Sequence, residues 1–157
     1  MTAARLIDAA RAKGARIATA ESCTGGLVAG AITDIAGSSD VFECGFVTYS
    51  NAAKVRMLDV REATLAEHGA VSEETAREMA EGGLSRSGAT LAVSITGIAG
   101  PGGSEHKPEG RVCFGIASSG GTLTETVDFG APGRAEVRRL SVAQALPLLS
   151  TAVDKLP

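Results

Sequence analysis

Four side chains that can attack, donate a proton or carry charge stand together in the segment AESCTGG, residues 20–26. The segment follows an apolar stretch, ARIATA, and precedes an amphipathic stretch, LVAGAITDI, so a strand is expected to turn into a helix there. Backbone N–H groups at a helix start can hold an anion. The segment therefore predicts a nucleophile beside an anion site. Helix capping by Ser22 or Thr24, with Glu21 as a partner of the helix dipole, explains the same residues.

A serine hydroxyl is a weak nucleophile unless a base accepts its proton. Histidine is the usual base, but His68 lies in an expected turn and His106 in a charged loop, and neither has an obvious carboxylate to orient it. Tyr49 and Lys54, in the segment TYSNAAK, offer another base, because burial lowers the pKa of a lysine amine. Ser-Lys pairs are a known variant of the catalytic triad. A solvated Lys54 and a half-buried Tyr49 are the alternative interpretation.

Cys23 competes with Ser22 for the role of nucleophile. A thiolate is intrinsically more nucleophilic, and helix N-termini lower the pKa of a thiol. Neighbouring side chains point in different directions, so only one of the two can face a shared pocket. Without a histidine partner, Cys23 is expected to be a buried, inert thiol.

A third polar cluster, SITGIAGPGG, covers residues 94–103. Thr96 ends an expected strand, and the glycines that follow can form a nest of N–H groups for an anion. The segment matches neither G-x-G-x-x-G nor a Walker loop. Arg134, Arg138 and Arg139 stand near the start of the last expected helix and could bind a phosphate through paired hydrogen bonds. A solvated helix face is the alternative for each arginine.

The elements that must position these clusters alternate between helix and strand. Apolar periodicity predicts helices at residues 3–10 and 25–35, after Asn51, after Ser72, and from Arg134 onward, where Pro147 should kink or split the helix. Strands are expected at residues 15–20, 41–50 and 90–96, and a hairpin at residues 111–118 and 122–130, whereas residues 59–71 are mixed with a turn at EHGA. This order predicts one domain, residues 1–157: an α/β protein with a three-layer α/β/α sandwich and a mixed, mostly parallel sheet. Each polar cluster follows a strand, so the three are expected to converge.

Composition argues against several classes of protein. Hydrophobic residues make up 44% of the chain but aromatic residues only 3%, so the core must consist of Ala, Val, Leu and Ile. A net charge of −3 argues against a general nucleic-acid binder. The chain lacks H-E-x-x-H and CxxC spacings, so no metal site is predicted. Three cysteines without a disulfide pattern, no signal peptide and no membrane-spanning stretch predict a cytoplasmic protein.

Four segments carry a resemblance to a known family. TAESCTGG, GSSDVFECGFVTYSNAAK, GAVSEETA and TGIAGPGG followed by KPEGRV resemble, in the same order, the signature segments of the CinA C-terminal-domain family, the nicotinamide-nucleotide amidases. The resemblance implies a stand-alone form of the domain, a sandwich similar to the anticodon-binding-domain type of fold, and a homodimer. It also implies deamidation of nicotinamide mononucleotide to nicotinate mononucleotide and ammonia, without a metal or an organic cofactor.

The same resemblance implies roles for individual residues. Ser22 matches the catalytic serine, and Tyr49 and Lys54 match the tyrosine and the lysine, so Lys54 is expected to take the serine proton with Tyr49 bridging or steering it. Arg134 matches the substrate-side arginine, with Arg138 as the alternative, because this chain has PGR where the family often has GDR. The substrate-binding residues are then expected to be Thr24, Gly25, Gly26, Thr96, Gly97, Gly100 and Arg134. Backbone N–H groups near Gly25 and Gly26 are expected to hold the oxyanion.

The alternative function is a non-catalytic nucleotide-binding or regulatory module, linked to competence or DNA damage. Such a module would bind a ligand saturably but release no ammonia. The acidic charge argues against direct contact with DNA, though not against binding a protein that handles DNA.

Overall fold

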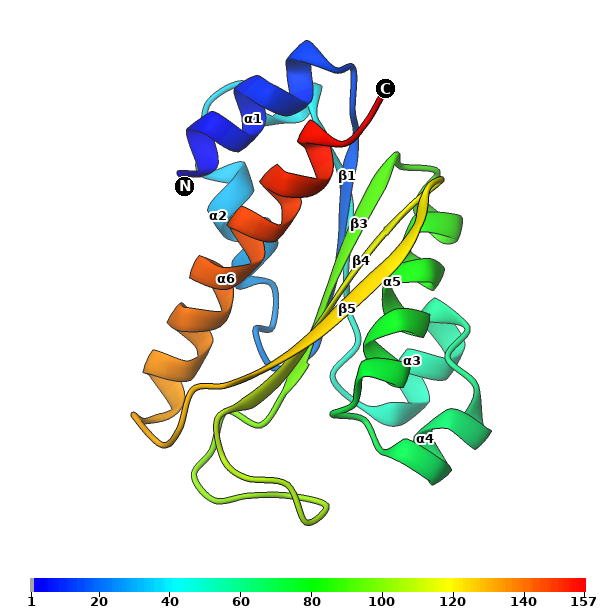
Figure 1. Ribbon diagram of the computed structural model, residues 1–157, viewed down its shortest axis with the longest axis vertical. Coiled ribbons are helices and arrows are strands. Elements are labelled where there is room, and N and C mark those ends of the chain that lie inside the picture. The colour runs from blue at the N-terminus through cyan, green and yellow to red at the C-terminus, as the bar shows by residue number, and fades with distance from the viewer. Residues whose placement is uncertain (1) are drawn as a thin grey trace.

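The computed structural model describes residues 2–157 and contains one five-stranded sheet with the strand order β2-β1-β3-β4-β5 (Figure 1). The strands are β1 (Ile17–Glu21), β2 (Phe42–Val47), β3 (Leu91–Gly97), β4 (Arg111–Ser118) and β5 (Gly121–Asp128). β1 is parallel to β2 and β3, whereas β4 is antiparallel to β3 and β5. All strands except β4 therefore run in one direction, which confirms the predicted mixed sheet.

Helices cover both faces of the sheet. On one face lie α1 (Ala3–Ala12), α2 (Leu27–Thr33) and α6 (Arg134–Asp154); on the other lie α3 (Asn51–Leu58), α4 (Glu62–His68) and α5 (Glu73–Ser87) (Figure 1). A short 3-10 helix, Ser38–Asp40, leads from α2 to β2. The predicted three-layer α/β/α sandwich is confirmed. Within residues 2–157, no helix has the length and apolarity that crossing a bilayer requires.

The burial of each strand follows from its place in the sheet. Every residue of β1 is buried, and so are the first six residues of β3, because helices cover both faces of these central strands. The edge strand β2 alternates between half-buried and exposed residues. The larger core cluster, under α1, α2 and α6, includes Leu6, Ile32 and Leu149, and a smaller one on the opposite face centres on Leu58 and Met79.

The structure adds detail to the expected pattern in two places. Residues 59–71 contain a helix, α4, whose start is capped from α5: the carboxylate of Glu78 accepts hydrogen bonds from the Arg61 N–H at 2.9 Å and from the Thr64 hydroxyl at 2.6 Å. A cap supplied from a distant element leaves no local signal, which is why the sequence indicated only a mixed segment with a turn and not the bounds of α4. α6 is not split at Pro147, because buried residues on both sides of the proline, including Leu146 and Leu149, pack it along the sheet.

Candidate active site

A cavity of about 370 Å³ opens where β1, β2 and β3 end, at the end of the sheet from which loop 98–110 extends in Figure 1. The three polar clusters of the sequence supply most of its lining, as expected from strand ends that meet at one edge. The lining residues are Ser22, Cys23, Tyr49, Asn51, Lys54, Ala70, Val71, residues 96–105 and Arg134.

Ser22 and Lys54 meet in this cavity. The Nζ atom of Lys54 lies 3.1 Å from the Oγ atom of Ser22, and it also contacts the backbone carbonyls of Thr48, at 2.9 Å, and Tyr49, at 3.4 Å. The lysine is 1% exposed and the serine 8% exposed. Burial lowers the pKa of Lys54 from its ordinary value of 10.5, because the charged form is deprived of water. The pair therefore has the distance and the environment that proton transfer requires.

Local structure explains how Lys54 reaches the serine. The hydroxyl of Ser50 caps α3 by accepting a hydrogen bond from the N–H of Ala53, so the helix begins at Asn51, a short turn after β2 ends at Val47. Lys54 lies in the first turn of this helix. Side chains there point back toward the preceding residues, which brings the amine to the carbonyls of Thr48 and Tyr49.

Cys23 lines the cavity but is only 5% exposed. Burial, the largest cause, raises the pKa of its thiol to about 12. The thiol therefore stays protonated at neutral pH and is a poor nucleophile. The raised pKa of Cys23 therefore favours Ser22 as the nucleophile.

Residues 24–26, the turn after Ser22, were expected to face the cavity but do not line it. Gly25 and Gly26 have φ values of +58° and +105° and precede α2, which begins only at Leu27. The N–H of Gly25 bonds to the Ser22 carbonyl at 3.0 Å, and the N–H of Gly26 bonds to the carboxylate of Glu21 at 3.3 Å. Thr24 is fully buried, and its hydroxyl donates to the same carboxylate at 2.6 Å. The donors of these three residues are also occupied, by Glu21 and Ser22.

Tyr49 and Arg134 form a pair at the cavity mouth. The tyrosine is 60% exposed, and its hydroxyl accepts a hydrogen bond from Arg134 at 2.7 Å. The hydroxyl therefore does not lie between Ser22 and Lys54 in this structure, so of the two expected roles, bridging and steering, the bridging geometry is not seen. A second nitrogen of Arg134 donates to the Gly100 carbonyl at 2.7 Å. Arg138 instead donates to the Cys23 carbonyl at 3.1 Å and does not line the cavity.

The remaining expected residues line the opposite wall. The hydroxyl of Thr96 donates to the Ala70 carbonyl at 2.8 Å, so it ties the end of β3 to the loop before α5. A Cβ atom at Gly97 would lie 3.1 Å from the sulfur of Cys23 and 2.7 Å from the Val112 side chain, so only glycine fits there. Gly100 has a φ of +93°, which glycine adopts without strain.

Several lining residues were not singled out from the sequence. Asn51 is one of them, and its place inside the TYSNAAK cluster was an available signal. Ala70 and Val71 come from the loop before α5, whose approach depends on tertiary packing alone. Neither histidine lines the cavity. Among residues 2–157, no group of three or more His, Cys, Asp or Glu side chains is arranged to hold a metal ion.

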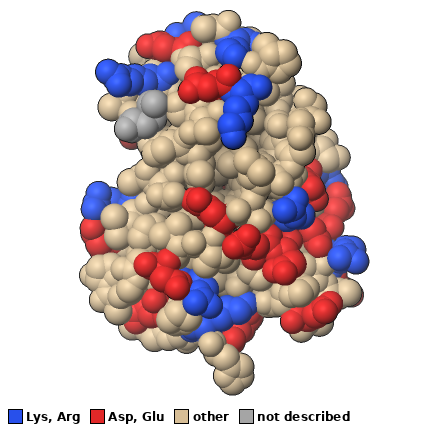
Figure 2. Space-filling view, in the orientation of Figure 1, with Lys and Arg blue, Asp and Glu red and all other residues tan. Residues whose placement is uncertain are grey.

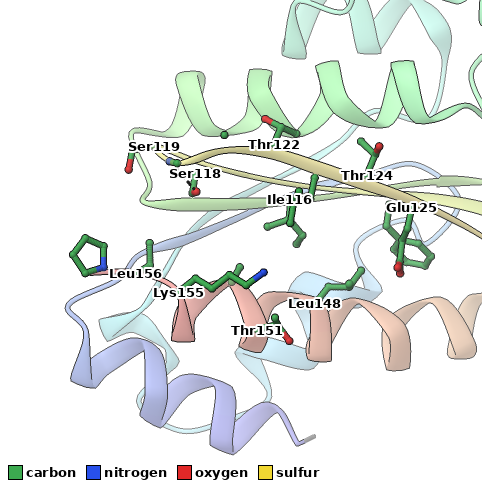
Figure 3. A pocket seen from close by; sticks show the side chains of 16 residues that line it. Ile116, Ser118, Ser119, Thr122, Thr124, Glu125, Leu148, Thr151, Lys155 and Leu156 are labelled. Carbon is green, nitrogen blue, oxygen red and sulfur yellow. Dashed lines mark hydrogen bonds between the residues drawn. The ribbon is translucent and has the colours of Figure 1, made fainter.

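A second, larger hollow of about 750 Å³ lies between the β4–β5 hairpin and the C-terminal part of α6. Figure 3 shows Leu148 and Thr151 of α6 on one side and Ile116 of β4 on the other. We call it the hairpin groove.

Figure 2 shows acidic and basic side chains interspersed on the face in view, without a continuous basic band.

Comparisons with known proteins show the family to which this α/β/α sandwich belongs. The family model described as "CinA C-terminal domain" matches residues 1–153, and the chain belongs to this family. It is 56% identical over 143 residues to the nicotinamide-nucleotide amidohydrolase PncC of Escherichia coli K12, covering 90% of this chain and 87% of that protein. It is 63% identical over 110 residues to a CinA-like protein of Chloroherpeton thalassium, covering 69% of this chain but 26% of that longer relative.

Solved structures of the same family share the fold. The competence/damage inducible protein CihA of Agrobacterium tumefaciens superposes with a TM-score of 0.93 at 49% identity, covering 98% of this chain and 93% of that one. The competence damage-inducible protein A of Klebsiella pneumoniae gives a TM-score of 0.93 at 37% identity, with both chains fully covered.

Proposed function

We propose that this protein is an amidohydrolase that converts nicotinamide mononucleotide to nicotinate mononucleotide and ammonia, with Ser22 as the nucleophile and Lys54 as the base. The 3.1 Å contact between Lys54 Nζ and Ser22 Oγ in a buried pocket carries the chemical part of the proposal. The similarity to the E. coli protein named nicotinamide-nucleotide amidohydrolase supports the substrate.

The surroundings of Lys54 suit both protonation states of the amine. A neutral amine has two N–H donors and one lone pair. The carbonyls of Thr48 and Tyr49 can accept both N–H groups, so the lone pair remains for the hydroxyl proton of Ser22. After proton transfer the ammonium has three donors for the same three oxygens. Little rearrangement is then needed during the transfer, and this preorganisation favours a low barrier.

The reaction follows from this geometry in two steps. Ser22 Oγ forms a bond to the carboxamide carbon while its proton moves to Lys54 Nζ. Lys54 then passes that proton to the amide nitrogen, the C–N bond breaks, and ammonia leaves an ester on Ser22. A water molecule attacks the ester, gives a proton to Lys54, and releases the carboxylate product as Ser22 recovers its proton. No step requires a metal or an organic cofactor.

The negative charge on the reacting oxygen needs donors other than Gly25 and Gly26. Within the described residues, the backbone N–H groups of Gly100 and Gly103 make no hydrogen bond and belong to the cavity lining. We assign the oxyanion and the substrate phosphate to N–H groups of residues 97–103, which form the glycine-rich wall of the cavity. Each oxyanion donor contributes about 3–4 kcal/mol in comparable enzymes.

Arg134 is the proposed partner of the 5′-phosphate, because it is the arginine that lines the cavity. Its hydrogen bond to the Tyr49 hydroxyl holds the guanidinium at the mouth. Tyr49 therefore orients Arg134 in this proposal. Thr96 and Gly97 shape the wall against which the substrate would lie.

Ammonia release from nicotinamide mononucleotide tests the proposal directly. Wild-type protein and Cys23→Ala should release ammonia, and Ser22→Ala should not. Activity in Ser22→Ala with loss in Cys23→Ala would assign the nucleophile to the thiol. Saturable binding of the nucleotide by wild-type protein without any ammonia would indicate the non-catalytic module instead. The homodimer and the cytoplasmic location stay predictions.

A further inference from the structure

We infer that Glu21 is a positioning residue for Ser22: its buried carboxylate holds the turn of residues 22–26 from one side, and Arg138 holds the same turn from the other. This inference rests on the proposed role of Ser22 as the nucleophile. Neither residue lines the cavity near the proposed base, so both would act through the turn and not on the substrate.

The carboxylate of Glu21 is 0% exposed and accepts four hydrogen bonds. One oxygen takes the Thr24 hydroxyl at 2.6 Å and the N–H groups of Gly26 and Val28 at 3.3 and 2.9 Å, and the other takes the N–H of Ala29 at 3.0 Å. A helix start leaves several N–H groups without partners, and Gly26 has no side chain to cap them. The residue directly before the proposed nucleophile therefore supplies the cap.

Arg138 binds the backbone carbonyl groups of the same turn. Its guanidinium donates to the carbonyls of Cys23, at 3.1 Å, and Thr24, at 3.4 Å. A Cβ atom at Gly25 would lie 3.3 Å from the same guanidinium, so the arginine packs closely against the turn. The turn is thus held through its N–H groups by Glu21 and through its carbonyls by Arg138.

Ser22 is held between the sheet and this turn. Its N–H bonds to the Ile95 carbonyl of β3 at 2.9 Å, and its own carbonyl accepts the N–H of Gly25 at 3.0 Å. A shift of the turn that pulls on the Ser22 carbonyl would therefore move Ser22 Oγ relative to Lys54, which lies on α3 and is also held by the Thr48 carbonyl. A displacement of about 1 Å between reacting groups can cost on the order of 100-fold in rate.

A positioning role and a purely structural role predict different kinetics. If the carboxylate only stabilises the fold, Glu21→Gln should lower the fraction of folded protein while kcat per folded molecule stays unchanged. If it positions Ser22, kcat per folded molecule should fall about 10–100-fold. KM should change less than about 3-fold, because the proposed phosphate contacts come from Arg134 and the glycine-rich wall.

Glu78→Gln is the matched control. Like Glu21, Glu78 accepts a threonine hydroxyl at 2.6 Å and a backbone N–H at 2.9 Å at the start of a short helix, α4. It does not line the cavity. The control should lose stability without losing kcat per folded molecule. An equal loss of kcat in Glu78→Gln would overturn the inference.

A fluorophosphonate probe provides a readout that does not depend on the natural substrate. It forms a P–O bond to an activated serine with loss of fluoride, and mass spectrometry locates it at Ser22. Slower labelling in Glu21→Gln, by a factor similar to the kcat loss, would support positioning. Labelling and kcat equal to wild type would overturn it. Where Glu21→Gln does not fold, Arg138→Gln takes its place with the same two outcomes.

The same probe separates this inference from the proposed function. Wild-type protein that is labelled at Ser22 but releases no ammonia from nicotinamide mononucleotide would refute the substrate, while the labelling rates still decide the role of Glu21. Wild-type protein that is labelled no faster than Ser22→Ala would overturn both.

Discussion

The active-site cavity and the hairpin groove lie at different parts of the same sheet and are lined by different kinds of residue. The groove is larger, about 750 Å³ against about 370 Å³, and side chains such as Phe114, Ile116 and Leu148 line much of it. The smaller cavity contains the buried Ser22–Lys54 contact, Arg134 and a wall of glycines. Volume alone would have pointed to the groove, whereas buried reactive groups point to the cavity.

Strand direction explains the difference. The cavity lies where three parallel strands end together, so three loops contribute polar side chains and N–H groups to one place. The groove lies beside the antiparallel β4–β5 hairpin, whose strands satisfy each other's backbone groups. Mutations in the two regions should therefore have separable effects on catalysis and on stability.

The largest expected effect is that of Ser22→Ala. Loss of the nucleophile should lower kcat for ammonia release by at least about 1,000-fold, as for other serine nucleophiles. Ser118→Ala removes a hydroxyl from the hairpin groove and is the matched control. It should keep wild-type kcat. A similar loss in both variants would remove the distinction between the two regions.

Lys54→Met should lower kcat by a comparable factor, and it should also change the pH dependence of stability. The pKa of Lys54 is lowered by burial in the folded state and stands near 10.5 in the unfolded state, so the unfolded chain binds more protons between those two values. The free energy of unfolding should therefore increase as pH rises from the folded-state pKa to about 10.5, and it should be lowest below the folded-state pKa.

Urea unfolding at several pH values measures this effect. Lys54→Met should flatten the rise, whereas Lys155→Met, which removes a lysine from the hairpin groove, should keep it. In wild-type protein, kcat/KM should also rise with pH as Lys54 becomes neutral, and it should level off below 10.5 because burial lowers the pKa. A Lys54→Met protein with the wild-type pH dependence of stability would contradict the burial argument.

Arg134→Met should mainly weaken substrate binding. Loss of the proposed phosphate contact should raise KM about 10–100-fold with a smaller change in kcat, because the reacting groups stay in place. Tyr49→Phe removes only the hydroxyl that holds Arg134 and should raise KM by less. Steady-state kinetics distinguish this from the bridging role: a kcat loss in Tyr49→Phe as large as in Lys54→Met would assign the hydroxyl to proton transfer.

Leu123→Ala should have the smallest effect. Leu123 lines the hairpin groove and is 66% exposed, so the free energy of unfolding should change by only about 0.5 kcal/mol. Both kcat and KM should match wild type. Thermal unfolding and the ammonia assay check the two parts, and a clear change in KM would link the groove to the active site.

The sequence allowed the fold class and the three site clusters to be predicted, because both depend on local patterns. Alternating helix and strand periodicity indicated the sandwich, and polar residues after successive strands indicated the cavity. Residue types offered Ser22 and Lys54 as one possible pair, and the resemblance to the family gave them their expected roles. The expected oxyanion role of the Gly25 and Gly26 N–H groups missed their partners in the folded turn, where the Ser22 carbonyl accepts from Gly25 and the Glu21 carboxylate accepts from Gly26.

Residue types and spacing thus determined which segments form strands and helices, and which of them carry reactive side chains. Periodicity and capping act over a few residues, so they can be read along the chain. Only the tertiary structure decided where single side chains point: Tyr49 toward Arg134, Arg138 toward the turn, and Lys54 toward Ser22. These directions depend on contacts between residues 32 to 115 positions apart, which no local pattern encodes.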